Sequence, residues 1–192
     1  MATKKNEKND EKNRIDEIIE KKNLENREIY IWGGIDDESA EKAVKKIRYL
    51  DSLEKADIRL FINSPGGVIS SGLAIVDAMN SAASDVSTIC MGQAASMGAV
   101  LLAVGKKGKR FIWPNARVMI HQPLISGQMF APASDIEIQA EEMLRIRESL
   151  NKILSGATGK KLEEIEHDTD RDFFMGADES IKYGIVDKHW KD

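Results

Sequence analysis

Strand-like and helix-like segments alternate along the first hundred residues, and this alternation restricts the possible folds more than any other feature. Short runs rich in β-branched and aromatic residues cover 28–32, 57–63 and a stretch that begins at Val86. The segments between them carry apolar residues at helical spacing, most clearly over 40–53. Such alternation is typical of β-α-β units whose strands pair in parallel. We therefore expect an α/β fold.

Length and composition narrow the class of protein. The 192 residues suffice for one domain with a real core, and the net charge of −4 argues against a nucleic-acid binder. No apolar run approaches the roughly 20 residues that cross a membrane. The charged N-terminus lacks a signal-peptide pattern and the single cysteine, Cys90, excludes an internal disulfide, so we expect a cytoplasmic protein. No His or Cys pair has metal-ligand spacing, so we expect no metal and no cofactor.

The domain organisation is predicted to be simple. Residues 1–13 are almost all Lys, Asn, Asp and Glu, so we expect a flexible charged tail. Residues 14–192 contain no linker and no internal repeat, which predicts a single domain that begins with a short amphipathic helix. Beyond residue 104 the pattern predicts strands at 110–113 and 117–120, a long helix from 135 to about 155, short helices at 160–167 and 177–183, and a final strand at 185–188. The long helix either packs on the core or projects toward another subunit.

Ser96 is the first candidate for chemistry. The sequence predicts a strand from Val86, a turn at 91–93 and a helix over 95–104, with Ser96 near the start of this helix. Backbone N–H groups are unpaired at a helix start and the helix dipole is positive there. A serine in this place suits a nucleophile, but it also suits a simple N-cap. From this segment alone, both interpretations stay open.

Three further signals bear on Ser96. A serine nucleophile needs a base, normally histidine, and the base needs a carboxylate that holds its tautomer. His121 ends a core strand, whereas His167 and His189 are expected at the surface. Carboxylates are supplied by the cluster Asp168, Asp170 and Asp172. The turn at Gly66-Gly67 leaves N–H groups free for an oxyanion, although a glycine pair alone more often makes only a tight turn.

Long motifs make the chain similar to the family of Clp protease proteolytic subunits. They are I-N-S-P-G-G-V at 62–68, S-T-I-C-M-G-Q-A-A-S-M-G-A at 87–99, G-K-R-F-I-W-P-N-A-R-V-M-I-H-Q-P at 108–123, D-I-E-I at 135–138 and D-T-D-R-D at 168–172. The similarity covers roughly residues 26–188. It implies a serine endopeptidase of crotonase-like fold, a spiral of β-α-β units with a protruding handle at about 124–155.

The resemblance also implies roles for individual residues. Ser96 matches the nucleophile, His121 the base and Asp172 the third member, with Asp168 as the competing choice. The backbone N–H groups of Gly67 and Met97 match the oxyanion donors. Hydrophobic residues that match the outer surface on which an ATPase docks are Phe61, Ile89, Met91, Phe111 and Trp113.

The family further implies an assembly. Its members form heptameric rings, and two rings stack through their handles into a tetradecamer whose active sites face an inner chamber. A hexameric AAA+ Clp ATPase unfolds polypeptide substrates and feeds them into this chamber. The net charge and the lack of a long apolar run predict no nucleic-acid or membrane partner.

Three departures from the family pattern suggest a modified assembly. The N-terminal segment is a Lys/Asn/Glu tail, Arg59 and Ser81 stand where aromatic residues are common on the docking surface, and Pro132 interrupts a slightly longer handle. A charge or a hydroxyl in an apolar pocket is costly when it is unpaired. The resemblance implies homo-heptameric rings, and the departures lead to the hypothesis that they are mixed with a paralogous ring that carries the ATPase dock. Two other functions remain as alternatives: a crotonase-type acyl-CoA enzyme, and an inactive structural ring subunit.

Overall fold

A computed structural model describes the backbone of residues 2–124 and 131–191, with side chains from residue 14 onward. Its strands form one sheet in the order β1-β2-β3-β4-β7, and β5 pairs with both β3 and β6. The strands are β1 (Glu28–Trp32), β2 (Ile58–Ser64), β3 (Val86–Ala95), β4 (Arg110–Ile112), β5 (Arg117–Ile120), β6 (Phe173–Met175) and β7 (Lys188–His189). The helices are α1 (Ala2–Glu25), α2 (Asp37–Leu53), α3 (Ile69–Ser81), α4 (Met97–Ala103), α5 (Ala133–Thr158), α6 (Leu162–Asp168) and α7 (Ala177–Tyr183).

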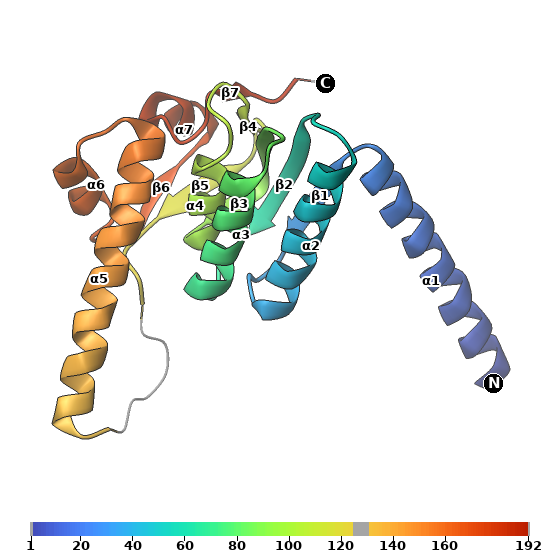
Figure 1. The fold of residues 1–192 in the computed structure, drawn as a ribbon, viewed down its shortest axis with the longest axis horizontal. Coiled ribbons are helices and arrows are strands. Elements are labelled where there is room, and N and C mark those ends of the chain that lie inside the picture. Colours follow the sequence, from blue (N-terminus) through green and yellow to red (C-terminus); the bar gives the residue numbers. More distant parts are fainter. Residues whose placement is uncertain (1, 125–130, 192) are drawn as a thin grey trace.

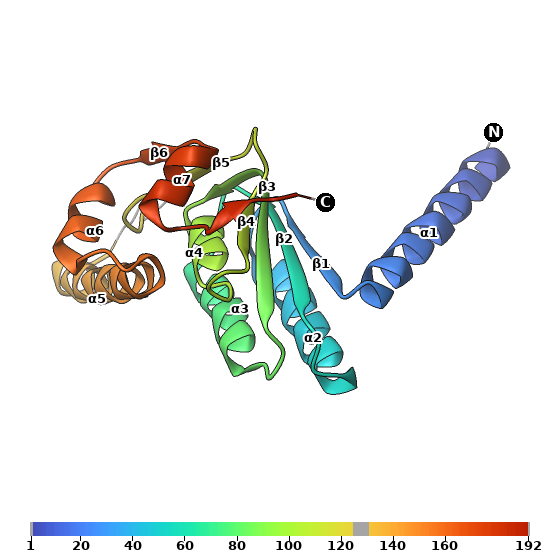
Figure 2. The ribbon, with the colours of Figure 1, turned by 90° about the horizontal axis from the view of Figure 1, so that it is seen from above.

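The sheet is parallel except at one pair of strands. Strands β1 to β4 and β7 pair in parallel, β5 continues in parallel from the end of β3, and only β5 and β6 run antiparallel among the strands described. Helices α2, α3 and α4 lie side by side along one face (Figure 2). The core lies between them and residues such as Leu60, Ile62 and Cys90, none of which is exposed. The predicted α/β architecture is confirmed.

The stretch from Val86 to Val104 differs from its prediction. Strand β3 continues through 91–93, where the sequence predicts a turn, and the helix begins at Met97. Gly92 adopts a φ of 65° and the pairing with β2 shifts register beside it. The side-chain oxygen of Asn63 accepts a hydrogen bond from the Gln93 N–H at 3.2 Å, which replaces a ladder bond. Gly92 therefore makes an irregularity within the strand and does not end it.

The long helix α5 both packs on the core and extends beyond it. It ends at Gly159, whose φ of 80° is the left-handed conformation that ends many helices. Leu150 and Leu154 near this end are buried, whereas Ile138 and Leu144 in the other half are exposed. That half projects away from the sheet (Figure 1), as expected for a handle. Part of the predicted handle, 125–130, lies outside the described residues.

Helix α1 is longer than the sequence pattern indicates. It begins at Ala2, so it includes most of the segment for which a flexible tail is predicted. The Ala, Lys and Glu residues in this segment have high helix propensity. The flexibility of residues 1–13 stays a prediction. Across the described residues, no helix has the length and apolar character that a membrane span requires.

Candidate active site

Ser96 stands directly after β3 and before α4, at the carboxyl end of the sheet. Its N–H donates a hydrogen bond to the Met119 carbonyl at 2.9 Å, which extends the pairing of β3 with β5 by one residue. Its backbone has a φ of 53° and a ψ of −123°, a conformation that is unfavourable for a residue with a Cβ. Ser96 occupies the N-cap position of α4, but its side chain makes no capping hydrogen bond. This observation weighs against the interpretation of Ser96 as a simple N-cap.

His121 reaches the same edge of the sheet because β5 lies beside β3. Ala95 pairs with Met119, so the residues that follow each strand emerge together at the carboxyl ends. The His121 side chain is mostly buried, with 13% exposed. In the described part of the chain, no hydrogen bond joins the Ser96 hydroxyl to the His121 ring. Both residues line one cavity.

Asp172 is brought to His121 by β6, a strand that the sequence analysis missed. Ile120 pairs with Phe173 across the antiparallel β5–β6 ladder, so His121 and Asp172 are the next residues on either side. Their side chains meet with Nδ1 of His121 3.0 Å from Oδ1 of Asp172. Asp168, the competing carboxylate, instead accepts a hydrogen bond from the Tyr183 hydroxyl at 2.8 Å.

The glycine turn after β2 packs against Ser96. A Cβ on Gly66 would stand 2.6 Å from the Ser96 Cβ and 3.0 Å from the Met97 nitrogen, so only glycine allows this approach. A Cβ on Gly67 would stand 2.0 Å from the Ile35 carbonyl oxygen. Within the described residues, the N–H groups of Gly67 and Met97 donate no hydrogen bond. Gly67 and Met97 line the same cavity as Ser96, an arrangement that is compatible with an oxyanion hole.

These groups line one cavity of about 820 Å³ between the sheet and α5. Ser96, Met97, Gly67 and His121 contribute to it from the sheet edge. The rest of its wall is mainly apolar and includes Leu73, Val100, Ile146, Leu150 and Leu154. A cavity with a few polar groups at one side and an apolar wall at the other can hold an extended organic substrate and orient one reactive bond.

Two polar residues near the cavity were not predicted. Asn151 of α5 is 3% exposed and Thr169 after α6 is fully buried, and they contact each other at 3.1 Å. Polar residues are usually exposed, so the sequence pattern gives no reason to place Asn151 or Thr169 in the interior. Only the motif D-T-D-R-D, which contains Thr169, could have drawn attention to the contact.

The remaining reactive groups are less suited to catalysis. Cys90 is buried, and burial raises the pKa of its thiol to about 12, which disfavours the reactive thiolate. His167 and His189 pair with Asp168 and Asp178, and neither lines the cavity that holds Ser96. Among the described residues, no group of three His, Cys, Asp or Glu side chains has the arrangement of a metal site.

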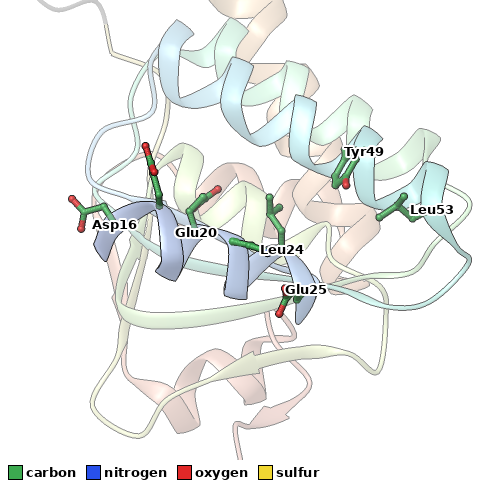
Figure 3. A pocket seen from close by; sticks show the side chains of 8 residues that line it. Asp16, Glu20, Leu24, Glu25, Tyr49 and Leu53 are labelled. Carbon is green, nitrogen blue, oxygen red and sulfur yellow. The ribbon is translucent and has the colours of Figure 1, made fainter. Parts of the chain in front are cut away.

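A second hollow, of about 730 Å³, lies between α1 and α2 (Figure 3). It has an apolar part formed by Leu24, Tyr49 and Leu53 and several acidic side chains, among them Asp16 and Glu20. Its lining residues, within the described part of the chain, include no serine, cysteine or histidine. This hollow therefore has no group that could act as a nucleophile with a base.

The predicted docking residues lie mainly on the sheet face opposite α4. Phe61, Ile89 and Phe111 are register partners on three adjacent strands, so they share one face. Thr88 points the other way and donates a hydrogen bond to the Leu102 carbonyl in α4. Phe61 and Ile89 are buried, and the Trp190 ring packs edge-on against Phe61 and Phe111. Met91 is partly buried and Trp113 is 39% exposed.

Arg59 is not an unpaired charge at this face. Its guanidinium forms an ion pair with Glu28 at 2.9 Å and donates to the Asn26 carbonyl at 3.1 Å. The side chain is 38% exposed. The cost expected for an unpaired charge in an apolar pocket therefore does not apply to Arg59. Ser81 donates to the Ala78 carbonyl at 3.2 Å and is itself exposed at the end of α3.

The fold is that of an α/β protein, and its sheet edge brings together a serine with a strained backbone, a His–Asp pair and two N–H groups that make no hydrogen bond within the described residues, an arrangement compatible with a hydrolase. Comparison with known proteins is consistent with this class. The Clp protease family matches residues 9–191, and the chain belongs to this family. The chain is 55% identical over 166 residues to the ATP-dependent Clp protease proteolytic subunit of Carsonella ruddii (strain PV), covering 86% of this chain and 84% of that protein. Neither comparison favours the acyl-CoA enzyme or the inactive subunit.

Proposed function

We propose that this chain is the proteolytic subunit of an ATP-dependent Clp protease and that it cleaves polypeptides as a serine endopeptidase. Ser96 is the nucleophile, His121 the general base and Asp172 the residue that orients the histidine. The observation that carries the proposal is that one cavity is lined by Ser96, by His121 in its pair with Asp172, and by Gly67 and Met97, whose N–H groups make no hydrogen bond within the described residues. Membership of the Clp protease family and the 55% identical relative support the same activity.

The reaction proceeds in two acyl-transfer steps. The Ser96 Oγ attacks the peptide carbonyl carbon while Nε2 of His121 takes its proton, and Asp172 stabilises the resulting imidazolium through Nδ1. The negative charge on the carbonyl oxygen is stabilised by the N–H groups of Gly67 and Met97. His121 then protonates the leaving amine, and an acyl-enzyme ester on Ser96 remains. Water, deprotonated by His121, hydrolyses this ester and restores the serine.

The separation of Ser96 from His121 implies a small rearrangement before catalysis. The hydrogen bond between Asp172 and His121 is already formed, whereas the one between His121 and Ser96 is not, within the described residues. Catalytic hydrogen bonds often tighten only when substrate binds. Substrate binding or subunit assembly completes the arrangement by moving the His121 ring toward Ser96.

The cavity wall suits an apolar side chain next to the scissile bond. Leu73, Val100, Ile146, Leu150 and Leu154 remove such a side chain from water, which favours binding by roughly 25 cal/mol for each Å² of apolar surface buried. We expect cleavage after medium-sized or large apolar residues. Such residues are buried in folded proteins, so an unfolded polypeptide is the suitable substrate.

The family implies the assembly that supplies unfolded substrates. We propose heptameric rings stacked as a tetradecamer, with α5 at the contact between rings and a hexameric AAA+ Clp ATPase on the outer face. The projecting half of α5, with Ile136, Ile138 and Leu144 exposed, supports a contact with another subunit. The docking surface comprises Phe61, Ile89, Met91, Phe111 and Trp113. An unpaired Arg59 on the docking surface would favour a complex in which only a paralogous ring binds the ATPase. Because Arg59 pairs with Glu28, this argument does not apply.

The catalytic proposal is tested with Ser96→Ala and a fluorophosphonate probe. We expect the wild-type protein to bind the probe covalently at Ser96 and to hydrolyse short peptides with apolar residues before the cleaved bond. Ser96→Ala should lose labelling and at least about 10³-fold in kcat/KM. Full peptidase activity in this variant would refute the assignment of Ser96.

The assembly is tested separately by native mass spectrometry of the purified chain, alone and with a paralogous subunit. A 14-subunit particle that degrades an unfolded protein with a Clp ATPase, without a paralogue, supports homomeric rings. Activity that requires the second subunit supports mixed rings.

A further inference from the structure

Thr169 connects helix α5 to the segment that carries Asp172. It directly follows α6, and its hydroxyl lies 2.8 Å from the Ile165 carbonyl oxygen and 3.1 Å from the Asn151 side-chain amide. Thr169 is fully buried and Asn151 is 3% exposed, so water does not compete for this contact. Helices α5 and α6 lie beside each other at this point (Figure 1).

The Thr169 hydroxyl is the donor in this contact. Its single proton lies within reach of the Ile165 carbonyl oxygen at 2.8 Å and of Oδ1 of Asn151 at 3.1 Å, with the Glu166 carbonyl oxygen farther away at 3.5 Å. Nδ2 of Asn151 has no hydrogen-bond partner among the described residues. One buried hydroxyl therefore joins α5 to the end of α6.

Two hydrogen bonds join the segment after Thr169 to the residues that follow β5. Nε2 of Gln122 donates to the Asp170 carbonyl at 2.7 Å, and His121 meets Asp172 at 3.0 Å. The Asp172 side chain is 58% exposed and His121 is its only hydrogen-bond partner among the described residues. The position of its carboxylate is therefore set by the backbone of 169–173. Asn151 provides the anchor at the start of this segment, and Gln122 provides the next one.

We infer that Asn151, through its hydrogen bond to Thr169, is a positioning residue that sets the place of Asp172 beside His121. The inference rests on the proposed roles of Ser96, His121 and Asp172. Asn151 also lines the cavity, as do Leu150 and Leu154, so the helix that forms the apolar wall is linked through Thr169 to the segment that carries Asp172. A shift of α5 moves Thr169 and changes the His121–Asp172 contact. Displacements of about 1 Å in a catalytic group can reduce rates by up to about 100-fold.

The test compares Thr169→Val with Thr169→Ser in the assembled protein, using a short peptide substrate. Valine keeps the volume and removes the hydroxyl, whereas serine keeps the hydroxyl. We expect Thr169→Val to lower kcat by roughly 10-fold to 100-fold with little change in KM. Thr169→Ser should retain at least half of the wild-type kcat. The inference would be overturned if the two variants had equal activity, whether high or low. It would also be overturned if Thr169→Val changed only KM.

A double-mutant cycle examines the same contact from the other side and serves if Thr169→Val does not accumulate. Asn151→Ala should lower kcat by a similar factor, and adding Thr169→Val should lower it little further, because both variants remove one interaction. If kcat of the double variant fell by the product of the two single losses, the inference would be overturned. Ser96→Ala, measured in parallel, separates the two proposals. Full activity in Ser96→Ala refutes the catalytic assignment itself. If Ser96→Ala is inactive and Asn151→Ala keeps the wild-type kcat, only the role of Asn151 is refuted.

Discussion

The two ends of the parallel sheet are built in opposite ways. At the carboxyl ends of β2 and β3, the N–H groups of Gly67 and Met97 make no hydrogen bond to any described residue, and the backbone at Ser96 is strained. At the amino ends, the residue immediately before each of five strands is charged and paired. These residues are Arg27 before β1, Asp57 before β2, Asp85 before β3, Lys109 before β4 and Asp187 before β7.

The amino-end residues join neighbouring strands to each other and to the helices. Lys109 bonds both Asp57 and Asp85, at distances between 2.6 and 3.1 Å. Arg27 donates to the carbonyls of Leu50, Glu54, Ala56 and Asp57. Arg110, the first residue of β4, is 2% exposed and binds Asp187 through two nitrogens.

This contrast explains how one end of the sheet can contribute to catalysis while the other end contributes to stability. Unpaired donors and an unfavourable φ each reduce stability by about 1–3 kcal/mol, but they are what an oxyanion hole and an exposed nucleophile need. The paired charges at the other end join the strands to each other and to the helices, although Arg27 there also has a positive φ, of 58°. Substitutions at the carboxyl end should therefore affect activity most, and substitutions at the amino end should affect stability most.

The largest expected effect is on activity and comes from Asp172→Asn. The amide cannot stabilise a protonated His121 and can favour the wrong tautomer, so we expect kcat to fall by about 10⁴-fold. Because Asp172 is 58% exposed, the thermal midpoint of unfolding should change little. Peptide hydrolysis and a thermal melt measure both quantities on the same sample.

Asp168→Asn is the matched control, because Asp168 lies four residues away and bonds Tyr183 instead of His121. This variant should keep a kcat close to that of the wild type. Loss of activity in Asp168→Asn with retention in Asp172→Asn would assign the catalytic carboxylate to Asp168.

An intermediate effect is expected for Gly67→Ala. The new Cβ would stand 2.0 Å from the Ile35 carbonyl oxygen, so the turn must move and carry the Gly67 N–H away from the oxyanion position. Loss of one such donor lowers kcat by about 10²–10³-fold. Gly34→Ala is the control, since its Cβ meets no atom within 4 Å and its φ is not positive. If both variants retain full activity, Gly67 is not an oxyanion donor.

The sequence predicted the parallel fold because β-branched runs and helical stripes alternate clearly over its first hundred residues. Ser96 and His121 could be identified because each follows a strong strand or precedes a helix. Strand β6 was missed because its three residues, from Phe173, follow a charged loop and show no alternation. The continuation of β3 through Gly92 was missed because it depends on Asn63 of another strand.

Contacts between distant residues were the least predictable. The Asn151–Thr169 hydrogen bond joins residues 18 positions apart, and Arg110 and Asp187 lie 77 apart. No local pattern in the sequence encodes these pairs, because each forms only after the sheet and helices have packed. The roles of Ser96, His121 and Asp172 came from the family motifs, since a triad is defined by geometry and not by spacing.

The smallest effect on catalysis and the clearest effect on stability are expected for Asp187→Asn. The substitution leaves Arg110 buried without its carboxylate, which costs about 3 kcal/mol in the free energy of unfolding. Urea unfolding at pH 7 measures this loss, and kcat at a temperature where the variant is folded should match that of the wild type. Lys109→Ala is the control at the same end of the sheet. Its ion pairs are more exposed, so its smaller effect should fade in 1 M salt, whereas that of Asp187→Asn should persist.

The same pair predicts a dependence on pH. Burial acts to raise the pKa of Asp187, but hydrogen bonds from Arg110 and the Gly108 N–H outweigh burial and leave the pKa below its usual value. A carboxyl whose pKa is lowered by folding stabilises the protein above its unfolded pKa, near 3.9. This contribution disappears as the pH falls through the lower, folded pKa. The stability difference between the wild type and Asp187→Asn should therefore be constant from pH 5 to 7 and shrink below about pH 4. A difference that stays constant down to pH 2 would show that the substitution disturbs packing and not the charge pair.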